Sequence, residues 1–536
     1  MKLNKHTFIV SLLGLGLLLT GCSNTERSQK NVANISATDQ ISTLDTAKIE
    51  DLSTSSLADD LFEGLYRYTS SGKVKPALAT KTTISNNGKT YTFSLRKGTK
   101  WSDGSTVTAH DFVYGWRRLV DPKTASGSTY LFTPVKNYQQ ISQGKMSPKE
   151  LGIRADGKYK LIVDLSSPTS YFKDLLARDA FGPVNSKTVK EYGKDYGTKS
   201  SRVTYNGPFV AKKWNGSNNS WSLVKNNNYW DKKHVKLDRI NYQVTKSPST
   251  SYSLFKSGKL DLIHLQGEQA KHFAKSKLAV TRYLSNTKYI EFNVKKGPFT
   301  NQKLRQALSL VIDRQKLTKN VLSNGATPSL GVVSLKTAKV PATGEDFAKA
   351  SHVKNTVDYN PNLAKKLWLA GLKEIGKTKL NVTIIYSDDN ASDAAMQLVQ
   401  STGEKNLPGL KISLSKMPLK SVITREEQHQ FTIGYIGWSG DYADPNTFLG
   451  MYNVKNDPGW SNSTYNQLME DANNKYANDP DQRFNNLINA EKLLMKEMPV
   501  SPIYQGNSRD LVSSKLKNVM YDPVNGHYSY KEAYVK

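Results

Sequence analysis

Asp441 is the acidic residue in this chain whose position most suggests a chemical role. Apolar side chains alternate from 431 to 435, which predicts that 431–437 is a strand and that 437–441 leaves it as a loop. In α/β sheets, ligands lie beyond the carboxyl ends of strands. A carboxylate there, beside Trp438 and Tyr442, could meet a cation in a cleft of low dielectric constant. On the residues alone, a loop aspartate that caps a turn is an equally good reading.

Asp444 follows three positions later and invites the idea of a catalytic pair of carboxylates. A structural role explains it better, because Pro445 comes next and favours the first position of a helix that begins at Asn446. We therefore predict that Asp444 is a helix cap and that this region holds no catalytic residue.

Enzyme signatures are missing from the chain, which contains no HExxH, GxSxG or Walker A motif. The eight His residues are dispersed, with no pair at metal-ligand spacing on a helix. Four Ser-x-x-Lys spacings lack the companion motifs of Ser–Lys acylases and are expected by chance in a chain rich in both residues. They are 70/73, 222/225, 253/256 and 413/416. We predict no catalytic residue, no metal and no cofactor.

Cys22 is the only cysteine, and it closes an apolar run that follows Lys2 and Lys5. A charged start, a short apolar core and a small residue before the Cys are typical of a secretory signal, and the core is too short to span a bilayer. The segment resembles a bacterial lipobox. We expect 1–21 to be a signal peptide, Cys22 to carry a diacylglycerol that anchors the protein on the outer face of a Gram-positive-like cell membrane, and 22–31 to be a flexible tether.

The remainder of the 536 residues is too long for one hydrophobic core, so two or more domains are expected. The formal net charge is +29, yet Lys is scattered without a basic block or a nucleic-acid motif. We interpret the charge as a solvated surface facing an anionic membrane and cell wall, and we do not expect nucleic-acid binding.

Strand and helix patterns alternate along the chain. Strands are predicted near 91–95 and 159–165, where apolar residues alternate after Asn/Asp-Gly turns. A helix is predicted over 304–312 behind a Thr300 cap. Further helices begin at Asn360-Pro361, ending at Gly371, and at Asp479-Pro480, ending before Pro499. The mixture indicates α/β or α+β layers.

Several short motifs together resemble one known family. They are DLFEGL (60–65), YTFSLRK (91–97), WSDG (101–104), DFVY (111–114), NGPF (206–209), PF (298–299), RQAL (305–308), GWSGDYADP (437–445) and PVSPIY (499–504). In this order they are similar to the family 5 extracellular solute-binding proteins, above all to the oligopeptide-binding lipoproteins of ABC importers. The resemblance runs through nearly all of the chain after the signal.

The resemblance implies an α/β fold of the type II periplasmic-binding-protein kind, in which two lobes close on a ligand like a clamshell. Lobe I would combine 32–66, 200–287 and 504–536. Residues 67–199 would form an inserted subdomain, and 288–503 would form lobe II. Hinges are expected where the chain crosses between lobes, near 286–290 and 502–506.

The resemblance also implies the ligand contacts. Asp441 matches the family's aspartate that binds the α-ammonium of a peptide. Ser439 and Gly440 match an edge that pairs with the peptide main chain, with Trp438 and Tyr442 beside it. Leu52 matches a contact from the other lobe. Tyr504 could line the cleft or belong to the core.

One departure from the best-known peptide binders lies just before the aspartate. They carry Arg residues that receive the peptide carboxylate, whereas Tyr435 occupies one such position here. Arg425 lies one position out of register with the other, beside Glu426 and Glu427. We therefore expect a ligand whose carboxyl terminus is not clamped by this region.

The expected function is that of a monomeric, lipid-anchored receptor that captures oligopeptides and delivers them to an ABC permease with separate ATPase subunits. Within the same architecture, dipeptides, nickel or haem are alternative ligands. A receptor for signalling peptides (pheromones) is another alternative, as is an adhesin that uses the basic surface.

Overall fold

The computed structural model describes residues 31–265, 267–453 and 459–536. The predicted signal peptide, Cys22 and nearly all of the tether lie outside these ranges. Within them, no helix combines the length and the apolar character needed to cross a membrane. The names lobe I, inserted subdomain and lobe II are kept below for the ranges given above, whose boundaries stay a prediction.

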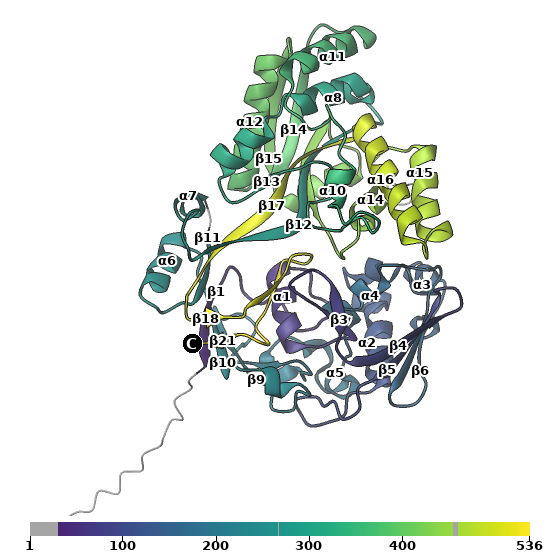
Figure 1. Cartoon of the computed structure of the whole chain (residues 1–536), viewed down its shortest axis with the longest axis vertical. Helices are drawn as coiled ribbons and strands as arrows, with labels where there is room; N and C mark the ends of the chain where they lie inside the picture. Colours follow the sequence, from purple (N-terminus) through teal and green to yellow (C-terminus); the bar gives the residue numbers. More distant parts are fainter. Residues whose placement is uncertain (1–30, 266, 454–458) are drawn as a thin grey trace, which may run out of the picture.

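One eleven-stranded sheet in the described part of the chain runs through both lobes. Its order is β15 (Leu410–Met417), β14 (Leu380–Ser387), β16 (Ile433–Ser439), β12 (Ala279–Phe292), β17 (Val500–Val512), β11 (Leu262–Leu265), β1 (Val32–Ala37), β10 (Arg239–Val244), β9 (Ser220–Lys225) and β8 (Phe209–Lys212), with β13 (Thr327–Pro328) paired to β17. The long strands β12 and β17 cross from one half of the molecule to the other (Figure 1).

These two crossing strands pair with each other irregularly. Their register shifts between Tyr283 and Thr287 and again between Lys288 and Tyr289. Bulges of this kind bend a strand and increase its twist. The predicted hinge ranges, 286–290 and 502–506, therefore fall inside β12 and β17 at or beside these irregularities.

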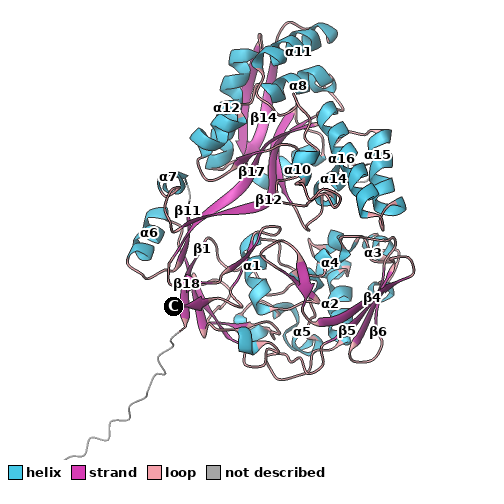
Figure 2. Ribbon diagram, in the orientation of Figure 1, coloured by secondary structure: helices cyan, strands magenta, loops and turns pink. Residues whose placement is uncertain are grey.

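Lobe II packs helices against strands β14, β15 and β16, and Figure 2 shows helices beside β14. Its main helices are α8 (Gln302–Leu310), α11 (Pro361–Glu374), α12 (Asn390–Asn406), α13 (Leu419–Glu427), α14 (Asn446–Leu449), α15 (Ser463–Glu470) and α16 (Pro480–Glu497), with short α9 (Arg314–Lys316) and α10 (Phe347–Ala350). One apolar core, whose buried members fall between Tyr289 and Tyr504, joins most of them, and α13 packs through Val422 on a separate small cluster with Ile385 and Phe431.

Lobe I and the inserted subdomain have separate apolar cores. Lobe I adds α1 (Leu52–Leu61), α6 (Pro248–Lys256), α7 (Gly267–His272) and the paired strands β18 (Leu516–Lys517) with β21 (Tyr534–Val535) and β19 (Met520–Asp522) with β20 (His527–Ser529). The subdomain has the sheet β4 (Ala79–Ser85), β5 (Thr90–Leu95), β7 (Lys160–Asp164), β6 (Ile153–Ala155) and helices α2 (Ala109–Leu119), α3 (Tyr138–Ser142), α4 (Phe172–Leu175) and α5 (Ser186–Tyr192). Strands β2 (Tyr66–Tyr68) and β3 (Val74–Pro76) pair at the boundary.

The predicted strands near 91–95 and 159–165 are confirmed as β5 and β7, and Asp479 is confirmed as the cap of α16. The prediction that Thr300 caps the next helix is wrong by one residue, because the Asn301 side chain accepts the hydrogen bond from Leu304 N. The predicted end at Gly371 is also wrong. A Cβ there would lie 2.7 Å from Leu304 Cδ2, so this glycine lets α11 approach α8 closely and the helix continues through it.

Candidate functional site

Strand β16 carries the predicted peptide-binding edge. The strand ends at Ser439 rather than at 437, so Trp438 and Ser439 belong to the strand and not to the loop. Both pair with β12, Ser439 opposite Asn286 and Trp438 opposite Thr287. Asn286 Nδ2 donates to Ser439 Oγ at 2.9 Å, which holds the strand end against its neighbour.

The opposite edge of the same segment is open. Strand β14 pairs with β16 only at Ile433–Tyr435. From 436 to 439, no strand in the described ranges pairs with β16 on the β14 side. An open edge presents main-chain N–H and C=O groups that can pair with an added strand. The edge around Ser439 is therefore geometrically available to an extended ligand.

A tight turn at Gly440 leads from the strand to Asp441. Gly440 N donates to Ser285 O at 2.6 Å, and a Cβ on Gly440 would lie 2.5 Å from Ser285 Oγ. The turn is closed by Thr447, which accepts from Asp441 N at 2.8 Å through Oγ1 and from Trp438 Nε1 at 2.9 Å through its carbonyl. Only glycine fits beside Ser285, so this residue fixes the direction in which Asp441 leaves the sheet.

The Asp441 carboxyl group is buried between lobe II and the inserted subdomain, with 9% of the residue exposed. Tyr130 OH donates to Oδ1 at 2.9 Å. Arg178 Nη1 donates to the main-chain O of Asp441 at 2.9 Å and lies 3.7 Å from Oδ1, which is beyond hydrogen-bond distance. No described residue donates to Oδ2.

Burial raises the pKa of Asp441, and the nearby Arg178 and the hydrogen bond from Tyr130 oppose that rise without cancelling it. A buried carboxylate normally has a close cation and several donors. Here the compensation is incomplete, so a further cation at Oδ2 would stabilise the ionised form. A primary ammonium has the required charge and donors.

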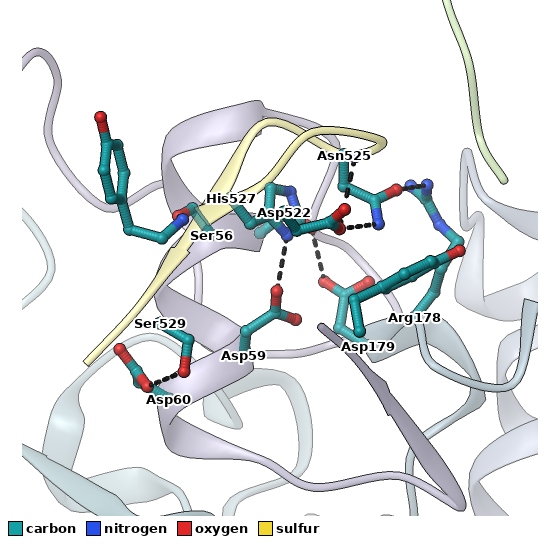
Figure 3. A network of polar contacts seen from close by, with 12 residues as sticks. Ser56, Asp59, Asp60, Arg178, Asp179, Asp522, Asn525, His527 and Ser529 are labelled. Atoms are coloured by element: carbon teal, nitrogen blue, oxygen red, sulfur yellow. Dashed lines mark hydrogen bonds and ion pairs between the residues drawn. The ribbon is translucent and has the colours of Figure 1, made fainter. Parts of the chain in front are cut away.

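Arg178 is itself fixed by lobe I. Its Nη1 donates to Asn525 Oδ1 at 2.6 Å, and Asn525 Nδ2 donates to Asp522 Oδ2 at 2.6 Å (Figure 3). Asn525 lies between β19 and β20. The subdomain, the C-terminal hairpin and the Asp441 loop therefore meet at one guanidinium group.

Tyr442 forms a second contact between lobe II and the inserted subdomain. Its ring stacks on Tyr171 with centroids 4.1 Å apart and planes 5° apart. The Tyr442 hydroxyl accepts from Asn446 Nδ2 at 3.1 Å, and burial raises its pKa. The two parts of the molecule are thus in direct contact on this side.

Asp444 is structural, but the prediction that it is the N-cap is wrong by one residue, because the N-cap of α14 is Pro445. Asp444 precedes the cap, and its Oδ1 accepts from Asn446 N at 2.9 Å. Arg483 on α16 also donates to both carboxylate oxygens, at 2.7 and 2.8 Å. The carboxylate is fully engaged, so it forms no acid–base pair with Asp441.

A cavity of about 1010 Å³ lies between the lobes. Leu52, the first residue of α1 and 54% exposed, lines it from lobe I, and residues 389–391 line it from lobe II. Asp441 is not a lining residue, but the cavity wall is adjacent to its loop. Leu284 and Gly526 line the cavity, and their chain neighbours are the Ser285 that holds Gly440 and the Asn525 that holds Arg178.

The predicted site residues thus fall into three groups. Asp441, Gly440, Ser439, Trp438 and Tyr442 gather around the end of β16, and Leu52 lies on the cavity. Tyr435 and Tyr504 are buried in the lobe II core, where Tyr435 OH donates to Tyr504 OH at 3.0 Å, and neither lines the cavity.

Arg425, the residue considered for the ligand carboxylate, is exposed on α13 and does not line the cavity either. The described residues contain no group of three or more His, Cys, Asp or Glu placed to hold a metal ion.

The sequence model of the bacterial extracellular solute-binding proteins, family 5, matches residues 73–460. The chain belongs to this family. It is therefore a solute-binding protein and not an enzyme, and the two-lobed type II fold expected for the family is confirmed by solved structures of its members.

Relatives of this family 5 protein match it from end to end. The dipeptide-binding protein of Lactococcus lactis subsp. cremoris is 35% identical over 97% of this chain and 97% of its own. Listeria monocytogenes OppA bound to peptide superposes with a TM-score of 0.79 at 35% identity, covering 95% of this chain and all of that one. The pheromone receptor PrgZ gives the same TM-score and coverage at 36% identity.

Residue patterns did not reveal Tyr130 and Arg178, two groups of this solute-binding protein that contact Asp441 from the inserted subdomain. They are 311 and 263 positions away in the chain. Neither belongs to a local motif, and a Tyr and an Arg in a subdomain give no sign of a partner in another lobe. Apart from Leu52, the cavity lining was missed for the same reason, since it collects residues from many segments.

Proposed function

We propose that this family 5 protein is a monomeric receptor that captures oligopeptides by their free amino terminus and delivers them to the permease and ATPase subunits of an ABC importer. Asp441 binds the α-ammonium of the peptide, and the 436–439 edge binds its main chain. The cavity between the lobes accommodates the side chains beyond the amino terminus.

The observation that carries this proposal is the incomplete compensation of Asp441. Its buried carboxylate has one hydrogen bond to Oδ1, a guanidinium 3.7 Å away and no donor at Oδ2 from the described residues. An ammonium group placed at Oδ2 supplies both charge and hydrogen bonds in a site of low dielectric constant, where they are strongest.

The open edge of β16 explains how such a receptor could take many sequences. Main-chain pairing supplies affinity without reading side chains, and a roomy cavity tolerates the side chains that arrive. Ser439 lies on this edge, and Leu52 approaches the cavity from the other lobe. The names of the relatives, a dipeptide-binding protein and an OppA bound to peptide, support a peptide ligand.

Asp441→Ala tests the proposal by calorimetry with matched peptides that have free or acetylated amino termini. Removing one partner of a buried charge pair costs on the order of 3–5 kcal/mol, or roughly a hundredfold or more in affinity. We expect that loss for free peptides and little change for acetylated ones, which should bind the wild type weakly.

Asp388→Ala is the matched control, because Asp388 is an exposed aspartate paired with Lys416 and does not line the cavity. Equal affinity of free and acetylated peptides for wild type and Asp441→Ala would refute the assignment.

The proposal includes a lipid anchor at Cys22 that holds the receptor on the outer face of the cell membrane. Labelling growing cells with radioactive palmitate should mark the wild type and leave the Cys22→Ser variant unlabelled, with the variant recovered in the medium. Label retained in the variant would contradict the anchor.

A receptor for a signalling peptide is the second candidate, favoured by the similarity to the pheromone receptor PrgZ. Native mass spectrometry of protein purified without denaturation separates the two. A nutrient receptor should retain a mixture of peptides, and a signalling receptor a single mass.

A further inference from the structure

The interlobe cavity has an aromatic wall on the lobe I side. Trp221 stacks on Tyr242 with centroids 5.5 Å apart and planes 11° apart. Tyr528 and Tyr530 continue the wall, with their rings 6.2 Å apart. Aromatic faces attract both apolar side chains and cations.

Two lining residues carry buried polar atoms without a partner in the described structure. Trp221 is 5% exposed, and its Nε1 has no acceptor. Gln269 Oε1 is buried and has no donor. Unpaired buried polar groups are rare in native proteins and each calls for an explanation. Both atoms are shielded from the open cavity, so they are not exposed contacts for a ligand in this structure.

The charge of the lining is opposite to that of the protein. The chain has a formal net charge of +29, but no Lys or Arg of the described residues lines the cavity. The ionisable lining residues are Asp39, His264, Glu268 and Asp389.

Asp389 is ionised at neutral pH. Burial opposes its ionisation, but hydrogen bonds from Ser387 and Ser392 hold the pKa of Asp389 below its ordinary value. Asp39 has no ion-pair partner among the described residues. Both carboxylates therefore place negative charge on the cavity wall, although both oxygens of Asp389 already accept hydrogen bonds from Ser387 and Ser392.

The nearest cations are occupied or lie outside the lining. His264 is paired with Asp510 at 2.7 Å, and Arg282 lies 3.8 Å from the same aspartate. Lys288 is half-buried near Asp389, and desolvation lowers its pKa. Lys246 lines an adjoining pocket of about 310 Å³ that shares Asp39 with the cavity. None of these groups offers an acidic ligand a free positive partner within the cavity.

Resting on the proposed function, we infer that the receptor selects peptides with a basic side chain behind the amino terminus and discriminates against acidic ones. The basic group enters the interlobe cavity and lies between the aromatic wall and the carboxylates of Asp39 and Asp389. An acidic side chain at the same position meets these carboxylates and no Lys or Arg among the described lining residues.

The test uses alanine pentapeptides with free termini that carry Lys, Gln or Glu at the third, fourth or fifth position, titrated into the wild-type protein by calorimetry. At the position that reaches the cavity, affinity should follow the order Lys, Gln, Glu, with about a two- to fivefold step for each carboxylate involved. The steps should shrink as salt is added. Equal affinities at all three positions, or tighter binding of Glu, would overturn the inference.

Charge-removing variants identify the groups responsible. In the Asp39→Asn/Asp389→Asn double variant, the ratio of Lys to Glu affinity should fall toward one. Asparagine keeps the Asp389 cap on α12, so the fold should persist. The neighbouring Asp388→Asn, which removes a charge outside the lining, should leave the ratio unchanged. A ratio that survives in the double variant contradicts the inference, whereas failure of every peptide to bind the wild type contradicts the proposed function itself.

Discussion

At the scale of single residues, the central feature of the site is that the buried Asp441 carboxylate lacks a full set of hydrogen-bond and charge partners. Asp441 is buried as deeply as a core residue, and the inserted subdomain gives it one tyrosine hydroxyl and a distant guanidinium. Arg178 donates its close hydrogen bonds to the main-chain O of Asp441 and to Asn525 Oδ1, not to the Asp441 carboxylate. The subdomain thus positions the Asp441 loop without neutralising its carboxylate, which stays available for a ligand cation.

We predict that replacing Gly440 by a larger residue destabilises the turn before Asp441. In Gly440→Ala, the new Cβ would meet Ser285 Oγ at 2.5 Å and Thr447 Cγ2 at 3.1 Å, so the loop must shift. Overpacking of this kind costs about 1–3 kcal/mol, which urea unfolding should detect. Adding Ser285→Ala should restore part of the loss, because it removes the closest atom.

Gly450→Ala is the control for this substitution, since its Cβ would find no atom closer than 3.6 Å. If the two alanine substitutions cost the same, or if Ser285→Ala adds its own cost to that of Gly440→Ala without any recovery, steric contact with Ser285 is not the reason for the glycine.

At the scale of elements, sequence patterns predicted correctly those helices and strands whose limits depend on neighbouring residues in the chain. Alternation located β5 and β7, and an Asp-Pro pair located the start of α16. The predictions were wrong where contact with another helix or strand determines the position at which an element ends. Gly371 looked like a helix end, yet it is a contact with Leu304 on α8. Strand β16 extends to Ser439 because β12 continues to pair with it after β14 has stopped.

The site was predictable only in the part that lies on one segment. Strand β16, the turn and Asp441 follow one another in the chain. The apolar alternation at 431–435 could therefore place Asp441 just beyond the end of a strand. The partners of Asp441, the arginine that clamps Asp444 and the lining of the cavity come from distant segments. Nothing in the alternation or capping of one segment specifies which other segment folds against it.

At the scale of the whole molecule, a basic surface encloses buried acids. Burial raises the pKa of Asp60, Asp174 and Glu491 to about 7 and that of Asp522 to about 6. Asp522 belongs to the polar network of the β19–β20 hairpin (Figure 3). In this network His527 Nδ1 lies 2.7 Å from Asp59 Oδ2. These carboxyl groups keep their protons in the folded protein at a pH where the unfolded chain has lost them.

The sign of the resulting pH dependence follows directly. Between about pH 4 and pH 7 the folded state binds more protons than the unfolded state, so the free energy of unfolding falls as pH rises. The raised pKa of His527 acts in the same direction, since its stabilisation is lost as pH rises through the folded-state value. Calorimetric scans should give a higher Tm at pH 5 than at pH 8.

Asp60→Asn should flatten this dependence, because it removes one of the groups that titrates, whereas Asp388→Asn on the surface should not. A Tm that is unchanged or higher at pH 8 would show that the buried carboxyl groups are ionised and fully compensated in the fold.

A crystal structure with a bound peptide of free amino terminus is the most direct test of the central claim. We expect the peptide to lie between the lobes, paired to the 436–439 edge, with its ammonium nitrogen about 2.7–3.2 Å from a carboxylate oxygen of Asp441. An ammonium placed away from Asp441, or a peptide bound outside the space between the lobes, would contradict it.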